Sequence, residues 1–379
     1  PVALSINFSP DGRAFIYGGR GRDSIKIFDT ATGRTINDFK LQPDVVYSIA
    51  HSPDGKYVLS GCGDSGLTLW NPSSGTSIKQ VVVGNGSTGR IVRAVAFSAD
   101  GEYALSGGGN NSVILWNARD LTRIKEFFGH TGVSGIWSVA FSPDGKYALS
   151  AGFTGEIKLW DLASGSEWKV LGGNIGINKG TSAKFSPDSK YVISAGDAAT
   201  RIWEVATGKE IASMIAFEDG EWIITTADGY YTSSPKGDQY LSVTVGGKQY
   251  TTDQLRESFY RPDLVNLALS GGSLRELKKI VDVKPPPVVA IVDTPKSIDR
   301  SDTAITLKIT DAGGGIGDIR LYLNGSAVML DSTRGVKIIA SNQNELTKTY
   351  KLKLSSGLNL IKAVAFNADN NMQSTDAVH

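Results

Sequence analysis

Residues 141–161, "FSPDGKYALSAGFTGEIKLWD", repeat the pattern of residues 51–71, "HSPDGKYVLSGCGDSGLTLWN". Each stretch contains a Ser-Pro-Asp-Gly turn, a run rich in strand-forming residues, a second turn and a short run that ends in Trp. Proline presets φ in such a turn, and Asp-Gly accepts the turn geometry that follows. Two such similar segments in one chain indicate an internal repeat.

The repeat has two independent markers. The turn motif begins at Ser9, Ser52, Ser98, Ser142 and Ser186, in steps of 43, 46, 44 and 44 residues. The aromatic residue that ends each unit is Phe28, Trp70, Trp116, Trp160 or Trp203, in steps of 42, 46, 44 and 43 residues. Because both markers have the same period, the repeat predicts structural units of about 44 residues, the size of propeller blades.

Each unit reads as four antiparallel strands. In the fourth unit these are "IWSVAF", "KYALSAG", "EIKLWD" and the weaker "SEWKVLGG". One four-stranded sheet cannot bury both of its faces, and stacking the sheets around an axis covers each face with a neighbour. The terminal Trp of each unit is therefore expected between two blades.

These motifs, together with Gly129-His130, resemble the WD-repeat family over roughly residues 1–210. The resemblance implies an all-β fold with a WD-repeat β-propeller. The family typically closes seven blades. Five units are clear here, and a sixth, degenerate unit is expected at about Ser213–Val245. Six blades are thus visible, and a ring of seven is possible. The propeller domain is predicted to span residues 1–250.

The resemblance also implies a hydrogen-bonded set of His, Ser or Thr, Asp and Trp inside a blade. The expected structural residues are Trp70, Trp116, Trp160, Trp203, His130, Ser150 and Asp64. No unit is complete, because Thr154 stands at the Asp position of the fourth unit and the second unit has no such His. We therefore interpret these residues as structural rather than as a Ser-His-Asp catalytic triad, and His51 as a packed residue.

One position lies four residues before the Phe or His of each turn motif, and it predicts a partner-binding surface. It is occupied by Leu4, Tyr47, Arg93, Trp137 and Thr181. The resemblance places this end of the innermost strand on the top face near the central channel, where partners dock. Tyr, Arg and Trp are enriched at binding hot spots. The alternative is that these side chains only fill the mouth of the channel.

The repeat pattern stops after Val245. Residues 251–284 predict a helical linker, in which Pro262 begins one helix and Ser273-Leu-Arg-Glu forms a capping box for another. Three prolines from Pro285 then act as a stiff spacer. Residues 285–379 alternate between short strands and turns, which predicts an immunoglobulin-like β-sandwich without the Cys…Trp…Cys core of antibody domains.

A second resemblance covers about residues 213–375. The stretches "FEDGEWIITTADGYYTSSPKGDQYLSV", "LRESFYRPDLVNLALSGG" and "TDAGGGIGDIRLYLNG" are similar to bacterial proteins that join a WD-repeat propeller and a sandwich to a caspase-family, metacaspase-like cysteine peptidase. The resemblance implies that the peptidase follows the sandwich, outside this chain. Its catalytic His and Cys have no counterpart in His51, His130 or Cys62, so we expect no catalytic residue here.

The composition narrows the remaining classes of function. The net charge of +1 over 379 residues gives no general attraction to nucleic acid, and no apolar run is long enough to insert into a membrane. One cysteine permits neither an internal disulfide nor a Cys-based zinc site. We expect no cofactor and no metal. The compartment, bacterial cytoplasm or exported, and the oligomeric state stay open.

The leading hypothesis is a non-catalytic module for protein–protein interaction, the sensor or scaffold part of a caspase-like peptidase. One alternative is a propeller hydrolase acting in its central channel. Another is a purely structural scaffold at a cell surface.

Overall fold

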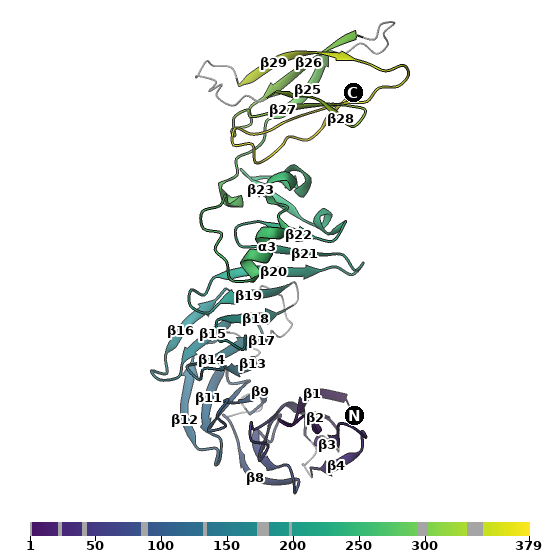
Figure 1. Cartoon of the computed structure of the whole chain (residues 1–379). Coiled ribbons are helices and arrows are strands. Elements are labelled where there is room, and N and C mark those ends of the chain that lie inside the picture. The colour runs from purple at the N-terminus through teal and green to yellow at the C-terminus, as the bar shows by residue number, and fades with distance from the viewer. Residues whose placement is uncertain are drawn as a thin grey trace. The chain divides into compact units, whose positions relative to one another are not determined.

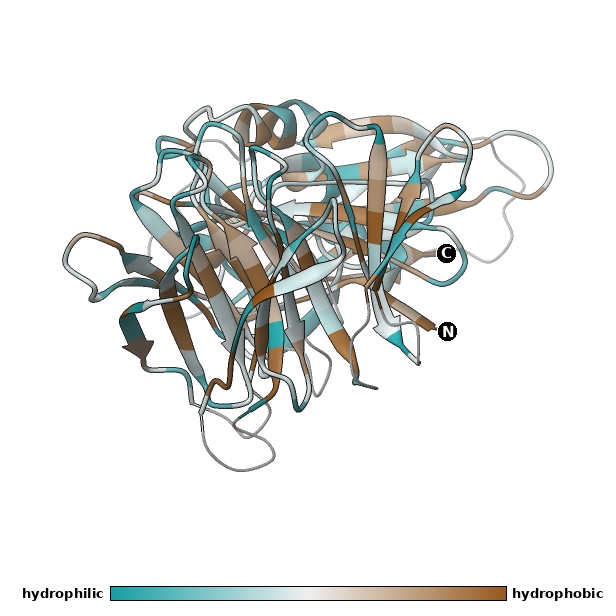
Figure 2. Ribbon diagram, turned by 90° about the horizontal axis from the view of Figure 1, so that it is seen from below, coloured by the Kyte–Doolittle hydropathy of each residue, from teal (hydrophilic) through white to brown (hydrophobic). Residues whose placement is uncertain are grey.

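The structure is a computed structural model that describes residues 2–21, 25–39, 44–84, 90–131, 135–172, 182–196, 199–293, 302–331 and 344–379. The chain divides into two compact units, Pro1–Ile215 and Ala216–His379, which are described separately. Figure 1 shows the first unit in purple to teal and the second in green to yellow. Hydrophobic residues lie mainly on the strands, and the connecting loops are largely hydrophilic (Figure 2).

The first unit consists of successive antiparallel sheets, each with four strands in this unit, which we call blades 1 to 5. Blade 1 contains β1 (Val2–Phe8), β2 (Ala14–Arg20), β3 (Ile25–Asp29) and β4 (Thr35–Asp38). Blade 2 contains β5 (Val46–His51), β6 (Val58–Cys62), β7 (Leu67–Asn71) and β8 (Thr76–Val81). Blade 3 contains β9 (Val92–Phe97), β10 (Tyr103–Gly108), β11 (Ser112–Asn117) and β12 (Arg123–Phe128).

Blade 4 contains β13 (Ile136–Phe141), β14 (Tyr147–Gly152), β15 (Ile157–Asp161) and β16 (Glu167–Leu171). Blade 5 contains β17 (Ser182–Phe185), β18 (Tyr191–Ala195), β19 (Thr200–Glu204) and β20 (Glu210–Ala216). The first strand of each blade lies beside the first strand of the next, from β1 through β5, β9 and β13 to β17. The chain thus forms the blades of a propeller, as the repeat predicts.

Each junction between two blades is a separate apolar core. We call the face that carries the terminal aromatic residue the first face of a blade, and the opposite side its second face. At the junction of blades 1 and 2, Ile16 and Ile27 on the second face of blade 1 pack against Ile49 and Trp70 on the first face of blade 2. The other three junctions repeat this arrangement. Neighbouring blades therefore bury one another's apolar faces, as stacking requires.

A buried hydrogen bond anchors the terminal Trp in four blades. The indole Nε1 donates to a serine hydroxyl of the second strand at 2.8 to 2.9 Å in each case. The pairs are Trp70–Ser60, Trp116–Ser106, Trp160–Ser150 and Trp203–Ser194. Because both partners are buried away from water, the bond satisfies two polar groups that would otherwise have no hydrogen-bond partner. Blade 1 has Tyr17 and Phe28 at the two positions and so departs from this pattern.

The Ser-Pro-Asp-Gly turn is held by its own side chains. In blade 2, the Ser52 hydroxyl donates to the Asp54 carboxylate at 2.7 Å, and the backbone N–H of Lys56 donates to the same oxygen at 3.0 Å. These two hydrogen bonds lower the pKa of Asp54 to about 2. In blade 5, Ser189 replaces the glycine at a φ of 61°. Its hydroxyl accepts a hydrogen bond from the Asp144 backbone at 3.1 Å, which links the turns of blades 4 and 5.

His51 is an outlier among the blades, and it yields a first prediction. Both of its ring nitrogens are buried without a hydrogen-bond partner among the described residues. The other blades have Phe at this register: Phe8, Phe97, Phe141 and Phe185. Removing unsatisfied buried polar atoms is favourable, so His51→Phe should stabilise the first unit by about 1–2 kcal/mol. Chemical denaturation would measure this gain.

The gain should depend on pH. Burial lowers the pKa of His51, against an opposing contribution from Asp11. A histidine whose folded pKa lies below its unfolded value costs stability as the pH falls through about 6.5, because the unfolded chain then binds the extra proton. His51→Phe should therefore stabilise more at pH 5 than at pH 8. An equal or smaller effect at pH 5 would contradict this assignment.

The sixth blade expected at Ser213–Val245 is a wrong prediction. Ser213 belongs to β20, which pairs with β19 as the fourth strand of blade 5. In the second unit, β21 (Trp222–Thr226) pairs with β22 (Tyr231–Ser233), whereas β23 (Ser242–Val245) pairs only with β24 (Lys248–Thr251) among the described residues. The physical reason is the turn at Gly246-Gly247, where both φ angles are positive and the chain folds straight back into a hairpin.

The linker that follows is less helical than expected. It contains η2 (Thr252–Gln254), α2 (Arg256–Phe259), α3 (Pro262–Leu269) and η3 (Ile280–Asp282). Pro262 begins α3 as predicted. The predicted capping box at Ser273 begins no helix. Only a long hydrogen bond is present there, from the Arg275 backbone N–H to the Ser273 hydroxyl at 3.3 Å. The segment instead passes through turns that bury Leu274.

The last part of the chain forms two antiparallel sheets around one core. One sheet has the order β25 (Val288–Asp293), β26 (Asp302–Thr310) and β29 (Glu345–Lys353). The other has the order β28 (Ser326–Asp331), β27 (Ile319–Leu323), β30 (Ile361–Ala365) and β31 (Ala377–Val378). Leu307 and Leu352 from the first sheet and Leu321 and Ala363 from the second share the buried core. The arrangement is a β-sandwich of three and four strands.

Candidate functional site

The candidate site lies at the beginning of the inner strands of blades 2, 3 and 4. Tyr47 is the second residue of β5, Arg93 of β9 and Trp137 of β13. A register shift interrupts the pairing at this point in all three blades. These bulges lie where Tyr47, Arg93 and Trp137 occur, so that all three side chains leave the regular alternation of the strand.

The three side chains form a continuous row. The Arg93 guanidinium lies 5.3 Å from the centre of the Trp137 ring and 6.0 Å from the centre of the Tyr47 ring. Arg93 therefore lies within cation–π distance of an aromatic ring on each neighbouring blade. Tyr47 and Arg93 are half-buried, whereas Trp137 is 41% exposed. The structure thus brings together three of the five predicted residues.

Phe153 extends the row and was missed by the sequence analysis. Its ring centre lies 5.5 Å from that of Trp137. Phe153 follows the end of β14, at the place where blade 2 has Gly63. A Cβ added at Gly63 would lie 3.9 Å from the Tyr47 ring and 2.7 Å from the Asp44 carboxylate. The available signal was the replacement of a loop glycine by an aromatic residue in a single repeat.

The remaining two predicted residues do not join the row. Leu4 lies on β1, exposed, and has no aromatic or charged contact with Tyr47 among the described residues. Thr181 lies outside the described residues. The site that can be described therefore consists of Tyr47, Arg93, Trp137 and Phe153, which we call the aromatic row.

The charge of Arg93 has no counter-ion in the part of the chain that the structure describes. Asp44 lies near Tyr47, and backbone N–H groups already bind its carboxylate. Those of Val45, Asp64 and Ser65 donate to it at 2.6, 3.2 and 2.7 Å. The aromatic row therefore presents the Arg93 guanidinium between two ring faces. No carboxylate of the described residues pairs with its N–H groups, so they can bind an acceptor on a partner.

Blade 4 contains a second cluster, built around His130. Its Nε2 lies 2.6 Å from the Ser150 hydroxyl, and its Nδ1 lies 3.1 Å from a Glu156 carboxylate oxygen. Burial lowers the pKa of His130, and Glu156 opposes this effect. Glu156 thus takes the place of the acid that was sought at position 154. Sequence reasoning missed it because it lies two residues further along the loop.

This cluster brings a Ser, a His and an acid together but lacks the access that catalysis needs. Ser150 is fully buried, and its hydroxyl also accepts the hydrogen bond from Trp160 at 2.8 Å. Lys158 is buried beside it and forms ion pairs with Glu156 and Glu167 at 3.3 and 2.6 Å. A substrate cannot reach a nucleophile that packs between blades. The arrangement supports the structural interpretation of His130 and Ser150.

The other predicted blade residues are distributed as follows. Trp70, Trp116, Trp160 and Trp203 are all buried at blade junctions. Asp64 is the exception, because its side chain is exposed on a loop and has no bond to Trp70 or Ser60. Cys62 is buried, and burial raises the pKa of its thiol to about 12, which makes it a poor nucleophile.

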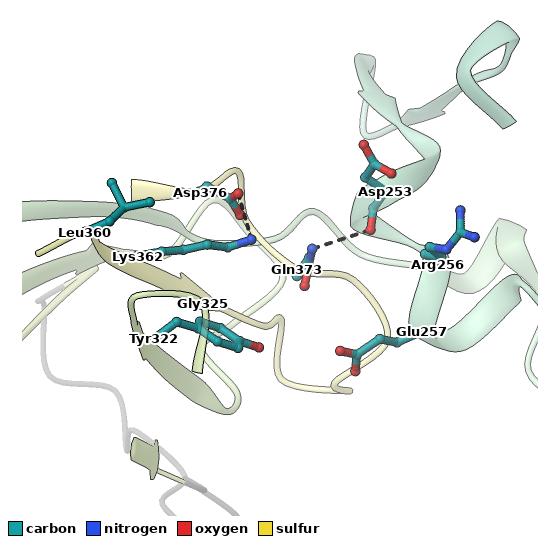
Figure 3. A pocket seen from close by; sticks show the side chains of 9 residues that line it. All are labelled: Asp253, Arg256, Glu257, Tyr322, Gly325, Leu360, Lys362, Gln373 and Asp376. Atoms are coloured by element: carbon teal, nitrogen blue, oxygen red, sulfur yellow. Dashed lines mark hydrogen bonds and ion pairs between the residues drawn. The ribbon is translucent and has the colours of Figure 1, made fainter. Parts of the chain in front are cut away.

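The second unit has a pocket of about 670 Å³ between the linker and the sandwich. Figure 3 shows Asp253, Arg256 and Glu257 on the linker side, and Tyr322, Lys362 and Asp376 on the sandwich side. Its charges are largely used in internal pairs. Lys362 contacts Asp376 at 2.8 Å, and Glu257 contacts Arg320 at 2.5 Å.

Backbone hydrogen bonds close the same joint. The Gln373 backbone N–H donates to the carbonyl of Gln254 at 2.9 Å, and the Gln254 side chain donates back to the carbonyl of Gln373 at 3.0 Å. A pocket whose polar groups bind one another offers little to a ligand. We therefore interpret it as the joint between linker and sandwich.

The described residues contain no cluster of three or more His, Cys, Asp or Glu side chains placed to hold a metal ion. None of their helices has the length and apolar character needed to cross a bilayer.

Comparison with known families identifies four repeats. The family described as "WD domain, G-beta repeat" matches residues 33–71, 78–117, 121–161 and 169–204. Each match ends at the third strand of a blade, from blade 2 to blade 5. Blade 1 is the blade without the Trp–Ser hydrogen bond, and its first three strands precede the first match.

Curated relatives match short stretches only. Striatin-3 of Homo sapiens is 39% identical over 57 residues, which is 15% of this chain and 7% of striatin-3. Striatin of Homo sapiens is 38% identical over 56 residues, and an Intraflagellar transport protein 122 homolog of Danio rerio is 35% identical over 65 residues. The chain thus matches 5 to 7% of the length of these relatives.

Proposed function

We propose that the propeller, which matches the WD-repeat family in four segments, is a non-catalytic interaction module that captures a partner protein on the aromatic row. The observation that carries this proposal is the position of Arg93 between Tyr47 and Trp137. Repeat proteins of this kind present rigid surfaces, and a surface preformed by three blades binds without the entropic cost of ordering it.

The chemistry of the row indicates what a partner would contribute. Trp137 offers an exposed ring for apolar contact, and Tyr, Trp and Arg dominate binding energy at protein interfaces. A guanidinium held against aromatic rings keeps its N–H groups in one plane, which suits a planar acceptor. We therefore expect the partner to place an Asp or Glu carboxylate on Arg93 and an apolar side chain on Trp137.

The second prediction tests this row. Replacing Tyr47, Arg93 and Trp137 together by Ala should abolish partner capture without unfolding the chain, because all three side chains lie at a strand end and none belongs to a blade junction. The wild-type and triple-variant proteins are immobilised, exposed to lysate of the native host, and the bound proteins are identified by mass spectrometry. Binding of the purified partner is then measured by calorimetry.

A control is Phe128→Ser, which removes an exposed aromatic residue from the outer strand β12. It should leave capture unchanged. Retained capture by the triple variant would show that the partner uses another face. Capture of no protein by the wild type would favour the purely structural scaffold.

For the second unit, we propose that its sandwich is immunoglobulin-like and couples partner capture to a caspase-like cysteine peptidase outside this chain. The support is the sandwich of three and four antiparallel strands and the resemblance of residues 213–375 to such proteins. The coding sequence around the segment for residues 1–379 tests the coupling. If the flanking coding sequence encodes no Cys–His peptidase, this proposal is refuted, whereas the proposal for the aromatic row is unaffected.

A further inference from the structure

A pocket of about 370 Å³ lies between blades 4 and 5, and all of its lining residues belong to the first unit. It is bordered by β14 and β16 of blade 4 and by β18 and β19 of blade 5 (Figure 1). Blade 4 contributes Tyr147 and Trp168, and blade 5 contributes Tyr191, Lys190 and Glu204. None of these residues belongs to the aromatic row, so the inference below does not depend on the function proposed for that row.

Trp168 departs from the pattern of the repeat. In the fourth strand of each of the five blades, a bulge opposite the terminal aromatic residue leaves one residue outside the regular pairing. Blade 4 has Trp168 at this bulge, whereas the other four blades have isoleucine: Ile36, Ile78, Ile124 and Ile211. The bulge itself therefore does not require the larger ring of Trp168.

The ring of Trp168 is held in place from both blades. It stacks on Tyr147 with ring centres 4.4 Å apart and 22° between the planes. The Lys169 ammonium lies 4.6 Å from the centre of the Trp168 ring and donates to the carbonyl of Ala206 on blade 5 at 2.6 Å. Tyr147 and Trp168 also pack against the buried core of this junction. The aromatic side of the pocket is thus preformed, which lowers the entropic cost of binding.

The polar atoms of the pocket's rings are available to a ligand. The indole N–H of Trp168 and the hydroxyls of Tyr147 and Tyr191 form no hydrogen bond with any residue that the structure describes, and they reach the solvent. Acceptors are scarcer, because one carboxylate oxygen of Glu204 already accepts a hydrogen bond from the Thr207 hydroxyl at 2.5 Å. The pocket therefore offers mainly hydrogen-bond donors.

The charges of the pocket lining balance each other. The ionised side chains of the described lining are Lys190 and Glu204, and Lys190 also contacts Asp188 at 3.9 Å. A lining with one cation and one anion has no net attraction for a charged ligand. Aromatic rings and donors without net charge favour a neutral ligand that presents acceptors and apolar rings together.

We propose that this pocket binds a proline-rich segment of a partner protein in the polyproline II conformation. Proline has no backbone N–H, so such a segment presents carbonyl acceptors and pyrrolidine rings but few donors. Its carbonyls accept hydrogen bonds from the Trp168 indole and the tyrosine hydroxyls, and its rings pack beside Tyr147 and Trp168. Pro286 and Pro287 of this chain are buried, so the segment comes from a partner. A neutral sugar fits less well, because its hydroxyls also need acceptors.

Calorimetric titration of the full chain with a blocked oligoproline peptide tests the proposal. The wild type should bind, and the indole N–H signal of Trp168 in the nuclear magnetic resonance spectrum should shift. Trp168→Ile should weaken binding by about 10-fold or more, because aromatic residues dominate binding energy. This variant should fold, since four blades have isoleucine at the bulge. Tyr147→Phe and Tyr191→Phe each remove one hydroxyl and should weaken binding about 3- to 10-fold.

The matched control is Tyr103→Phe, because Tyr103 has the same register in blade 3 and lies outside the pocket lining. It should leave binding unchanged. A flexible peptide of Gly and Ser should bind much more weakly than oligoproline, because it lacks the preformed conformation. Equal binding of that peptide, or unchanged affinity of Trp168→Ile, would overturn the proposal. A wild type that does not bind oligoproline would also overturn it, whether or not it binds the neutral sugar cellotriose.

Discussion

Trp160→Ala is expected to destabilise the first unit by about 3–5 kcal/mol. Trp160 is 1% exposed at the junction of blades 3 and 4, with Phe127 at 5.6 Å and His130 at 6.2 Å between ring centres. The substitution leaves a cavity between two sheets that cannot approach each other without breaking the neighbouring junctions. It also removes the indole donor from Ser150. Denaturant unfolding followed by circular dichroism measures the loss.

The matched control is Trp137→Ala, which removes the same side chain from the same blade. Trp137 is 41% exposed, so its loss leaves no closed cavity and should cost less than about 1 kcal/mol. Equal losses for the two variants, or an unchanged unfolding midpoint for Trp160→Ala, would refute the burial of the terminal Trp. The comparison also shows that a Trp137 variant stays folded, which the binding experiment requires.

Arg256→Met is expected to cost the second unit about 3 kcal/mol. Asp238 is buried, and its carboxylate pairs with the Arg256 guanidinium, which also lies 4.6 Å from the centre of the Tyr260 ring. Without the cation, a charge stays buried without a partner. Unfolding of the full chain, followed by the fluorescence change of the second unit, measures the effect.

Two controls separate the buried charge from the loss of a side chain. Asp238→Asn in the Arg256→Met background should restore part of the stability, because an amide carries no charge to bury. Arg261→Met removes an arginine from an exposed pair with Asp263 in the same linker and should cost no more than about 1 kcal/mol. A loss for Arg261→Met as large as that for Arg256→Met would mean that burial of Asp238 does not decide the effect.

Local sequence patterns predicted much of the fold. The period of the turn motif and of the terminal aromatic placed the strands of five blades, because Pro-Asp-Gly sets turn geometry within four residues and alternation sets the face of each side chain. The same reasoning wrongly predicted a sixth blade at Ser213–Val245, because the turn at Gly246-Gly247 pairs β23 with β24. The capping box at Ser273 shows the same limit, since a helix of that length needs tertiary packing to persist.

The candidate site shows a similar division. Register along the repeat selected Tyr47, Arg93 and Trp137 from the sequence, because equivalent positions of stacked units lie side by side. Phe153 and Glu156 escaped, since both lie on loops whose course the repeat pattern does not fix.

By itself, the sequence determined that this chain forms repeated four-stranded blades with a Trp at each blade junction, because residues a few positions apart set these features. Only the tertiary structure decided that Arg93 lies between two rings and that His130 lies beside Glu156. These outcomes depend on which surfaces meet after folding, and contacts between segments distant in the chain are fixed by packing rather than by local preference.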